Sequence, residues 1–353
     1  MVAIMVINYN GLRWLSQCLS SVVKTKYPSY KIYLIDNGSV DRSVEYVHEK
    51  YPSVKVIQNS RNLGFAEAYN RAISQIEAEY VVLLNNDTEV LDPKWLSYLV
   101  SVANGDRQVA AVACKMVSME DHGLLESVGG MGIPYWRGFV DVGREEVDQG
   151  QYPDDFEPFA FCGGAALIRK SALIEAGGFD EAFFLYLEDP DLSWRLRLLG
   201  WKVGYSSGAK VAHYLGGTTG GREVTPLRLY YCHRNLLRSI IKNCGASLAW
   251  ALKNYFLFSL LMIAGFSVFE PRKVIVVLKG IAWNIGNLRS TYASRLGVQT
   301  RRKVSEQEVL RRMYPTLARK QPTEYASLRR ILNMLFEHGG RRKFHAAIQI
   351  RAS

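Results

Sequence analysis

Short apolar runs and amphipathic stretches alternate along the first hundred residues of the chain. The apolar runs predict strands, at 3–7, 31–35, 54–57 and 80–84. Between them, apolar residues recur at helical spacing, and the predicted helices cover 12–22, 41–50, 64–76 and 93–102. Strands that alternate with helices indicate an α/β fold, in which helices flank both faces of a mostly parallel sheet.

Each of the four predicted strands ends in a polar cluster. The clusters are Asn8-Tyr9-Asn10, Asp36-Asn37, Asn59 to Asn62 and Asn85-Asn86-Asp87. Parallel strands bring their carboxyl ends to one edge of a sheet, and ligands of open α/β sheets bind outside that edge. We therefore expect a binding site built from four strand ends rather than from one motif.

The regular alternation weakens after about residue 117. Residues 119–160 are rich in Gly, Asp, Glu and aromatic residues and predict loops. A strand followed by a helix is expected over 165–173, and a helix over 192–199 leads to an apolar run at 201–205.

The charge of the chain divides at about residue 222. Residues 1–222 hold 21 Lys and Arg against 27 Asp and Glu, a net charge of −6. Residues 223–353 hold 23 against 6, a net charge of +17, and are aromatic and helical in pattern. The sequence thus predicts one domain over 1–222 and a basic, partly apolar helical region over 223–353.

Composition limits the class of protein. Apolar residues make up 48% of the 353 residues, enough for a sizeable core. The five cysteines are scattered without a CxxC pair, which argues against a zinc knuckle or a disulfide framework and fits a reducing compartment such as the cytoplasm. The first residues, MVAIMVIN, read as a strand without a basic leader, so we expect no signal peptide.

A single carboxylate, Asp87, follows the fourth predicted strand in LLNNDTEV (83–90). Two interpretations are open from the residues alone. Asp87 can cap a turn or the next helix, or it can bind a Mg²⁺ or Mn²⁺ ion that keeps several waters and contacts substrate phosphates. His213, at the end of another strand-like run, is a candidate metal ligand, although a lone histidine is more often a core or surface residue.

Three acids, Glu188, Asp189 and Asp191, crowd together after the aromatic run FFLYL (183–187). Acids and Pro190 suit the first turn of a helix, so stabilising a helix start is one interpretation. Burial behind the aromatic side chains would instead raise a carboxyl pKa and favour a general base.

Seven segments, taken together and in order, resemble glycosyltransferase family 2, and within it the rhamnosyltransferase-like members of the GT-A fold. The segments are INYN (7–10), LIDNGSVDRS (34–43), NLGFAEAYNRAI (62–73), LLNNDTEV (83–90), CGGAALIRKSAL (162–173), GGFDEAFFLYLEDPDLSWRLRLLGW (177–201) and AHYLGGT (212–218). The resemblance covers roughly residues 2–222 and implies a GT-A-type nucleotide-binding catalytic domain there.

The resemblance also implies which residues bind the donor. Tyr9 and Asp36 match positions that hold the nucleotide base, with Asn10 beside them. Gly64 and Asn70 match the loop and helix that line the nucleotide.

A metal site and a catalytic base are implied in the same way. Asn85-Asn86-Asp87 takes the place of the family's DxD motif, and Asp87 matches its metal-binding last acid. His213 matches a histidine that joins the metal or diphosphate site. In the pair Glu188-Asp189, Asp189 matches the catalytic base. The sequence departs from the DxD pattern at Asn85, which leaves one carboxylate for the metal instead of two.

These roles imply an inverting glycosyltransferase. It would move a sugar from a nucleotide-diphosphate-sugar, UDP- or dTDP-linked, to a hydroxyl of a glycan or lipid-linked saccharide in cell-surface polysaccharide or glycoconjugate synthesis. Asp189 would take the proton of that hydroxyl, which attacks the anomeric carbon in one displacement. A divalent cation and local amides would offset the charge on the leaving diphosphate.

The C-terminal region contains two apolar runs. The first, 247–269, is interrupted by Lys253 and Asn254, and its remainder, 255–269, would be about 22 Å long as a helix, short of a bilayer core of about 30 Å. The second covers 274–285. Short apolar helices with basic flanks suit peripheral contact with an anionic membrane, on its cytoplasmic face. Packing on the catalytic domain or on a second copy of the chain is the alternative, and no recognition motif predicts a nucleic-acid partner.

Two other functions stay open at this point. A sugar-phosphate nucleotidyltransferase also places a metal at the end of a parallel sheet, but it would want a Gly-rich signature with a basic residue near the first strand, which INYNGLRWL lacks. A non-catalytic, membrane-bound subunit that binds a sugar nucleotide or glycan would not need both Asp87 and Asp189.

Overall fold

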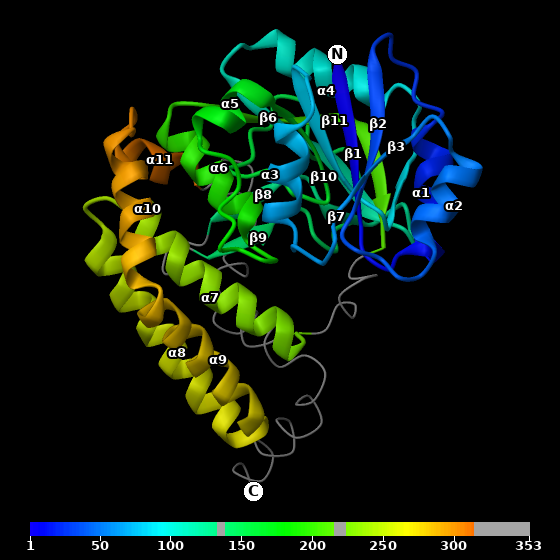
Figure 1. Ribbon diagram of the computed structural model, residues 1–353. Coiled ribbons are helices and arrows are strands. Elements are labelled where there is room, and N and C mark those ends of the chain that lie inside the picture. The colour runs from blue at the N-terminus through cyan, green and yellow to red at the C-terminus, as the bar shows by residue number, and fades with distance from the viewer. Residues whose placement is uncertain (133–137, 215–223, 314–353) are drawn as a thin grey trace, which may run out of the picture.

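A nine-stranded sheet dominates the computed structural model, which describes residues 1–132, 138–214 and 224–313 (Figure 1). The four expected strands are β1 (Val2–Asn8), β2 (Tyr30–Asp36), β3 (Lys55–Gln58) and β4 (Tyr80–Asn85). The four expected helices are α1 (Leu12–Val22), α2 (Ser43–Lys50), α3 (Ala66–Ser74) and α4 (Trp95–Gly105). The apolar pattern thus predicted these elements to within a few residues.

The strands of the sheet follow the order β3-β2-β1-β4-β10-β6-β11-β5, with β7 (Leu125–Ser127) beside β6. β1 pairs in parallel with β2 and β4, and β2 with β3. β10 (Ala165–Arg169) runs antiparallel between β4 and β6 (Val109–Ser118). β11 (Lys202–His213) is parallel to β6, and β5 (Thr88–Val90) is antiparallel to β11. The expected α/β fold is confirmed, with antiparallel strands inserted beyond β4.

Strand β6 is not predicted by the apolar pattern of the sequence. All ten of its residues, VAAVACKMVS, are buried. A fully buried strand lacks the alternation of apolar and polar residues that marks a half-buried one, so periodicity cannot separate it from a buried helix. The region 119–160 was expected to form loops, but it contains β7, β8 (Gly130–Gly132) and β9 (Phe139–Asp141).

Two apolar cores cover the two faces of the sheet. One contains side chains from α1, α2 and α4. The other contains side chains from α3, α5 (Lys170–Glu175) and α6 (Glu188–Leu198). Residues 2, 4 and 6 of β1 belong to the first core and residues 3 and 5 to the second, because successive side chains of a strand point to opposite faces.

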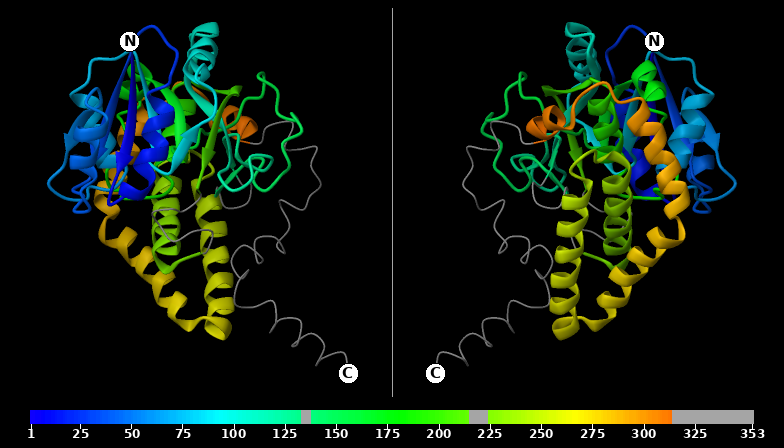
Figure 2. Two further views of the ribbon diagram at one scale, coloured as in Figure 1. Left: turned by 90° about the vertical axis from the view of Figure 1, so that its right-hand side faces the viewer. Right: turned by 90° about the vertical axis from the view of Figure 1, so that its left-hand side faces the viewer.

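The described part of the C-terminal region is helical, as expected. It contains α7 (Pro226–Asn243), α8 (Leu248–Phe269), α9 (Pro271–Gly286), α10 (Leu288–Thr300) and α11 (Glu306–Arg312). A third core packs Trp194 of α6 against Ile240 of α7 and Tyr255 of α8. α8 and α9 form a hairpin that projects away from the sheet (Figure 2). The domain boundary expected at residue 222 lies within 215–223, outside the described residues, and stays a prediction.

The division of the apolar run at Lys253 and Asn254 was wrong, because α8 is one unbroken helix of 22 residues. Lys253 is exposed, and a charged side chain facing outward does not interrupt a helix. At about 1.5 Å per residue the 22 residues of α8 span about 33 Å. Among the described residues, α8 is the one helix long and apolar enough to cross a membrane, a test of length and composition that core helices of soluble proteins also pass.

Candidate active site

The carboxyl ends of β1, β2 and β4 meet at one edge of the sheet, the edge that faces α7 (Figure 1). The strand register places Asn8 beside Asp36 and Ile7 beside Asn85. The buried side chain of Asn8 connects the three ends. Its Nδ2 donates to Asp36 Oδ1 at 3.2 Å, and its Oδ1 accepts from Asn86 Nδ2 at 2.7 Å. The expected convergence of strand ends is therefore present.

Three of the expected donor-binding residues lie at the ends of β1 and β2. Asp36 is fully buried, and its Oδ2 accepts the backbone amides of Gly38 at 3.2 Å and Ser39 at 3.0 Å, so this carboxylate shapes the turn after β2. Tyr9 and Asn10 lie beyond the end of β1 and are exposed. A ligand could reach the ring of Tyr9 more directly than the carboxylate of Asp36. The donor-binding roles of these residues stay predictions.

Gly64 and Asn70, at and after the loop that follows β3, contact the loop 179–187. Gly64 has φ +75°, and a Cβ at this position would lie 2.2 Å from the carbonyl oxygen of Phe184, so the close approach requires glycine. The Asn70 amide bonds both backbone groups of Phe179, each at 2.9 Å. These contacts hold one part of the protein to another, and contact of either residue with a nucleotide stays a prediction.

Asp87 and His213 meet beside β5. Pairing of β5 with β11 aligns Thr88 with His213, which brings His213 Nε2 to 3.4 Å from Asp87 Oδ1. Asp87 is buried, and apart from this contact with His213 its Oδ1 accepts no hydrogen bond from the residues that the structure describes. On its other side, His213 Nδ1 lies 2.8 Å from Glu126 Oε2. Burial alone would lower the pKa of His213, but its contacts with Asp87 and Glu126 outweigh burial and raise that pKa to about 10.

This arrangement fits a divalent cation. Asp87 Oδ1 is a buried carboxylate oxygen whose one side-chain contact within the described residues is with His213, the second candidate ligand. A metal ion binds a histidine nitrogen only after that nitrogen has lost its proton. With Nε2 of His213 deprotonated, Glu126 would orient the ring through Nδ1, which is the usual arrangement behind a metal-ligating histidine. The described residues contain no group of three or more His, Cys, Asp or Glu side chains arranged to hold a metal. Two protein ligands would leave room for waters and substrate phosphates, as Mg²⁺ prefers.

Glu188 and Asp189 form the first turn of α6, which begins four residues before the expected start of this helix. The N-cap position is taken by Leu187, so neither acid caps the helix. Asp189 is partly exposed, and its Oδ2 accepts a hydrogen bond from the backbone amide of Gly163 at 2.7 Å. Glu188 is buried, and its Oε2 has no hydrogen-bond partner in the described part of the chain.

Both acids of this turn hold their protons more tightly than ordinary carboxyl groups. Although Asp189 is partly exposed, desolvation of its carboxyl group raises its pKa from 3.8 to about 7, against the lowering effect of the Gly163 amide, and the charge of Asp141 adds to the rise. Burial and the charges of Asp189 and Asp191 raise the pKa of Glu188 well above 4.5. A carboxyl group with a pKa near neutrality at a strand-end site is suited to accept a proton.

Asp191 is bound entirely within the protein. It is fully buried and accepts hydrogen bonds from side chains of α6 and α7, namely Arg195 (2.9 Å), Ser239 (2.9 Å), Lys242 (2.8 Å) and Asn243 (2.9 Å). Asp191 therefore joins α6 to α7 and is not a candidate base.

Sequence reasoning missed two acids near the site, Glu126 on β7 and Asp141 on β9. Both lie in the stretch that was expected to form loops, where no periodic pattern marks the short strands. Asp141 Oδ1 accepts from Ser127 Oγ of β7 at 3.0 Å, and the charge of Asp141 acts on Asp189 of α6. Only the pairing of these strands brings the two acids to the site.

The sequence matches the family model described as Glycosyl transferase family 2 over residues 3–177. The chain belongs to this family. Its fold is the GT-A fold expected from the sequence, and its likeness to rhamnosyltransferases is confirmed by a relative. Membership makes the chain a glycosyltransferase. It argues against the alternative interpretation, a sugar-phosphate nucleotidyltransferase.

Similarity to known proteins covers more of the chain than the family match at residues 3–177. The N-acetylglucosaminyl-diphospho-decaprenol L-rhamnosyltransferase of Mycobacterium tuberculosis is 26% identical over 255 residues, covering 65% of this chain and 80% of that one. Among solved structures, GalNAc-T7 with UDP, GalNAc and Mn²⁺ has a TM-score of 0.58 at 17% identity, covering 81% of this chain and 57% of that one. Staphylococcus aureus TarS 1–349 in complex with UDP-GlcNAc has a TM-score of 0.54 at 17% identity, covering 92% and 91%. These two structures show the fold.

Proposed function

We propose that the chain is an inverting glycosyltransferase that uses a UDP- or dTDP-sugar and glycosylates a lipid-linked saccharide during synthesis of a cell-surface polysaccharide. The name of the M. tuberculosis relative, with its diphospho-decaprenol acceptor and rhamnosyl group, supports a lipid-linked acceptor. GalNAc-T7 in complex with UDP and TarS in complex with UDP-GlcNAc support a nucleotide-sugar donor.

One contact pattern supports this function above the others. The dipeptide Gly163-Gly164 donates its first amide to Asp189 Oδ2 at 2.7 Å, and the carbonyl of Gly164 accepts from the amide of Asn85 at 3.0 Å. A candidate base is thereby held beside the strand end that carries Asp87. In this proposal the diphosphate lies at Asp87 and the anomeric carbon is turned toward Asp189.

The chemistry assigned to the chain's own residues is a single displacement. Asp189, deprotonated near neutral pH, accepts the proton of the acceptor hydroxyl as its oxygen attacks the anomeric carbon. The Gly163 amide orients the carboxylate through Oδ2 and leaves Oδ1 to receive the proton. Attack from the side opposite the diphosphate inverts the configuration at that carbon, and no covalent sugar–enzyme intermediate forms.

A Mg²⁺ or Mn²⁺ ion is part of the proposal. Asp87 and His213 would hold it, and when bound it would neutralise charge on the departing diphosphate. Mn²⁺ accompanies UDP in the GalNAc-T7 structure, which supports a divalent cation here. Asn85 and Asn86 add amide groups without negative charge.

A donor screen tests this function. UDP-, dTDP- and GDP-sugars are each incubated with the full chain, a membrane extract as acceptor source, and Mn²⁺ or Mg²⁺, and release of the nucleoside diphosphate is followed. The proposal expects release from a UDP- or dTDP-sugar that depends on the cation. Binding of a sugar nucleotide without release in any of these mixtures would favour the non-catalytic binding subunit instead.

The pH dependence of turnover should report the raised pKa of Asp189. A base works only when deprotonated, so kcat/KM should rise by about tenfold per pH unit below neutrality and level off above pH of about 7. The measurement is an initial-rate series at constant ionic strength on the donor found in the screen. A midpoint at the ordinary carboxyl value of about 4 would remove Asp189 from the role of base.

We also propose that the helical region holds the enzyme at the cytoplasmic face of an anionic membrane, where a lipid-linked acceptor would be met. The α8–α9 hairpin exposes large apolar side chains, among them Leu260 (63% exposed), Val268 (73%) and Ile275 (57%). Lys253 and Arg272 are exposed on the same two helices. Apolar side chains interleaved with cations suit an anionic bilayer surface.

Vesicle co-sedimentation at low and high salt tests the membrane proposal. Surface charge is screened by salt, whereas inserted apolar side chains are not. We expect binding to anionic vesicles that persists at high salt and is lost in a Leu260→Ser, Val268→Ser double variant. The control is Val40→Ser, which removes an exposed apolar side chain (87%) from the catalytic domain. Binding lost at high salt would mean electrostatic attraction alone, and no binding at either salt would favour a protein partner for the hairpin.

A further inference from the structure

The loop 179–187 enters α6 through an unfavourable backbone turn. Tyr186 and Leu187 are consecutive residues in the left-handed region, both with φ 68°. Residues with a bulky Cβ substituent rarely adopt this conformation, and it persists only where neighbouring structure holds it. The turn stands directly before Glu188 and Asp189, so its shape decides where the two carboxyl groups point.

Asn235 of α7 holds this turn. Its Nδ2 donates to the carbonyl oxygens of Leu185 at 2.9 Å and Tyr186 at 2.7 Å. Its Oδ1 accepts from Arg234 Nε at 2.8 Å, and the side chain is fully buried. Both amide hydrogens and the amide oxygen are therefore used, and two of the three bonds go to the backbone that must stay in the unfavourable conformation.

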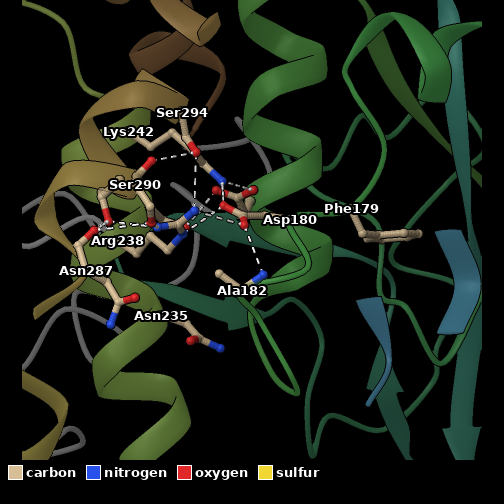
Figure 3. Close-up of polar contacts among 12 residues, drawn as sticks. Phe179, Asp180, Ala182, Asn235, Arg238, Lys242, Asn287, Ser290 and Ser294 are labelled. Carbon is tan, nitrogen blue, oxygen red and sulfur yellow. Dashed lines mark hydrogen bonds and ion pairs between the residues drawn. The ribbon is translucent and has the colours of Figure 1, made fainter. Parts of the chain in front are cut away.

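The same face of α7 donates further hydrogen bonds to the loop 179–187. Arg234 Nη2 donates to the carbonyl of Ala182 at 2.7 Å. Arg238 donates through two nitrogens to the carboxylate of Asp180, at 2.9 and 3.1 Å, and Lys242 also bonds it (Figure 3). Basic–polar pairs recur every four residues in RNLLRSIIKN (234–243), which places them on one side of the helix.

We propose that Asn235 is a positioning residue of the transfer reaction, which fixes the 185–187 backbone and through it the carboxylate of Asp189. The inference rests on the proposed function, since it takes Asp189 as the base. It extends the active site to α7, which lies beyond the family match at 3–177. The basic region would thereby contribute to catalysis through α7 as well as to membrane attachment through α8 and α9.

A purely stabilising role is the alternative, and the chain contains a matched control for it. Asn284 of α9 is also buried, and its Nδ2 also donates to two carbonyls, those of Arg234 at 2.9 Å and Gly280 at 3.0 Å. Asn235→Ala and Asn284→Ala each remove two hydrogen bonds to carbonyl groups, and Asn235→Ala also removes the bond that Arg234 Nε donates. The first faces the loop before the base, and the second faces only the packing of α9 on α7.

Hydrogen–deuterium exchange of the full chain provides a readout that needs no donor. Asn235→Ala should speed amide exchange over residues 183–191 by about tenfold or more, because the turn opens locally. Asn284→Ala should leave that segment unchanged even where both variants melt at lower temperature. Asn235→Ser, which keeps one donor, should be intermediate and serves if the alanine variant does not fold.

Kinetics on the sugar nucleotide identified by the screen complete the test. For Asn235→Ala, kcat should fall by about tenfold or more with KM within about twofold, since a displaced base costs rate and not donor affinity. Asn284→Ala should retain kcat. Unchanged exchange over 183–191, or faster exchange with wild-type kcat, would overturn the positioning role. Absence of wild-type turnover would instead show that the proposed function fails, so the two failures are distinguishable.

Discussion

Asp189→Asn should lower turnover by about 10²–10⁴-fold, the usual contribution of a general base. The amide has nearly the shape of the carboxylate and can still accept the Gly163 amide, but it cannot take up a proton. The donor diphosphate is proposed to lie at Asp87, on the other side of the Gly163-Gly164 turn, so donor affinity should stay near that of the wild type. Initial rates of nucleoside diphosphate release and calorimetric donor binding measure the two effects separately.

Glu188→Gln is the comparison variant for this experiment, because Glu188 is the neighbouring acid with a raised pKa. If Asp189→Asn keeps more than about a tenth of normal turnover, the role of base moves away from Asp189. Collapse in Glu188→Gln instead would assign it to Glu188. Asp191 does not enter this choice, since its carboxylate is occupied by side chains of α6 and α7.

Asp87→Ala should abolish the effect of the cation on nucleotide binding. Asp87 supplies the single carboxylate of the DxD position, and its Oδ1 lies 3.4 Å from Nε2 of His213, the other residue proposed to hold the cation. Loss of a residue behind a metal ligand costs about 10–100-fold in metal affinity, so loss of the ligand itself should exceed about 100-fold. Calorimetric titration of UDP with and without Mn²⁺ measures this directly.

Glu89→Ala is the matched control, because it removes the same charge two residues further along, on β5. It should leave the Mn²⁺ effect intact. Unchanged UDP affinity and an unchanged response to Mn²⁺ in Asp87→Ala would remove the metal site from the end of β4. The amides of Asn85 and Asn86 would then have to offset the diphosphate charge without a cation.

The sequence predicted the elements that follow simple periodicity, and failed where burial hides it. The four strands and four helices of the first hundred residues alternate clearly and were located. β6 was missed because every residue of it is buried. The strand-end clusters were located because polar residues directly after apolar runs are visible in the sequence, whereas Glu126 and Asp141 reach the site only through β7 and β9.

The charge of the C-terminal region shows a second limit. The +17 charge of 223–353 was interpreted as a surface that meets an anionic membrane. Three of these cations, Arg234 (5% exposed), Arg238 (3%) and Lys242 (2%), are buried on α7 and bond the loop 179–187 or acids beside it. A polar face repeating every four residues looks the same whether it meets water or carboxylates of another element, so only the fold distinguishes the two.

The central claim is a single displacement in which Asp189 takes the proton of the attacking hydroxyl. The stereochemistry of transfer tests it most directly. With the donor identified by the screen, proton NMR at early times records the anomer of the sugar as it is first released to water or to an acceptor. We predict a product configuration opposite to that of the donor, and loss of the product signal in Asp189→Asn. A product with the donor's own configuration would contradict the single displacement and the role given to Asp189.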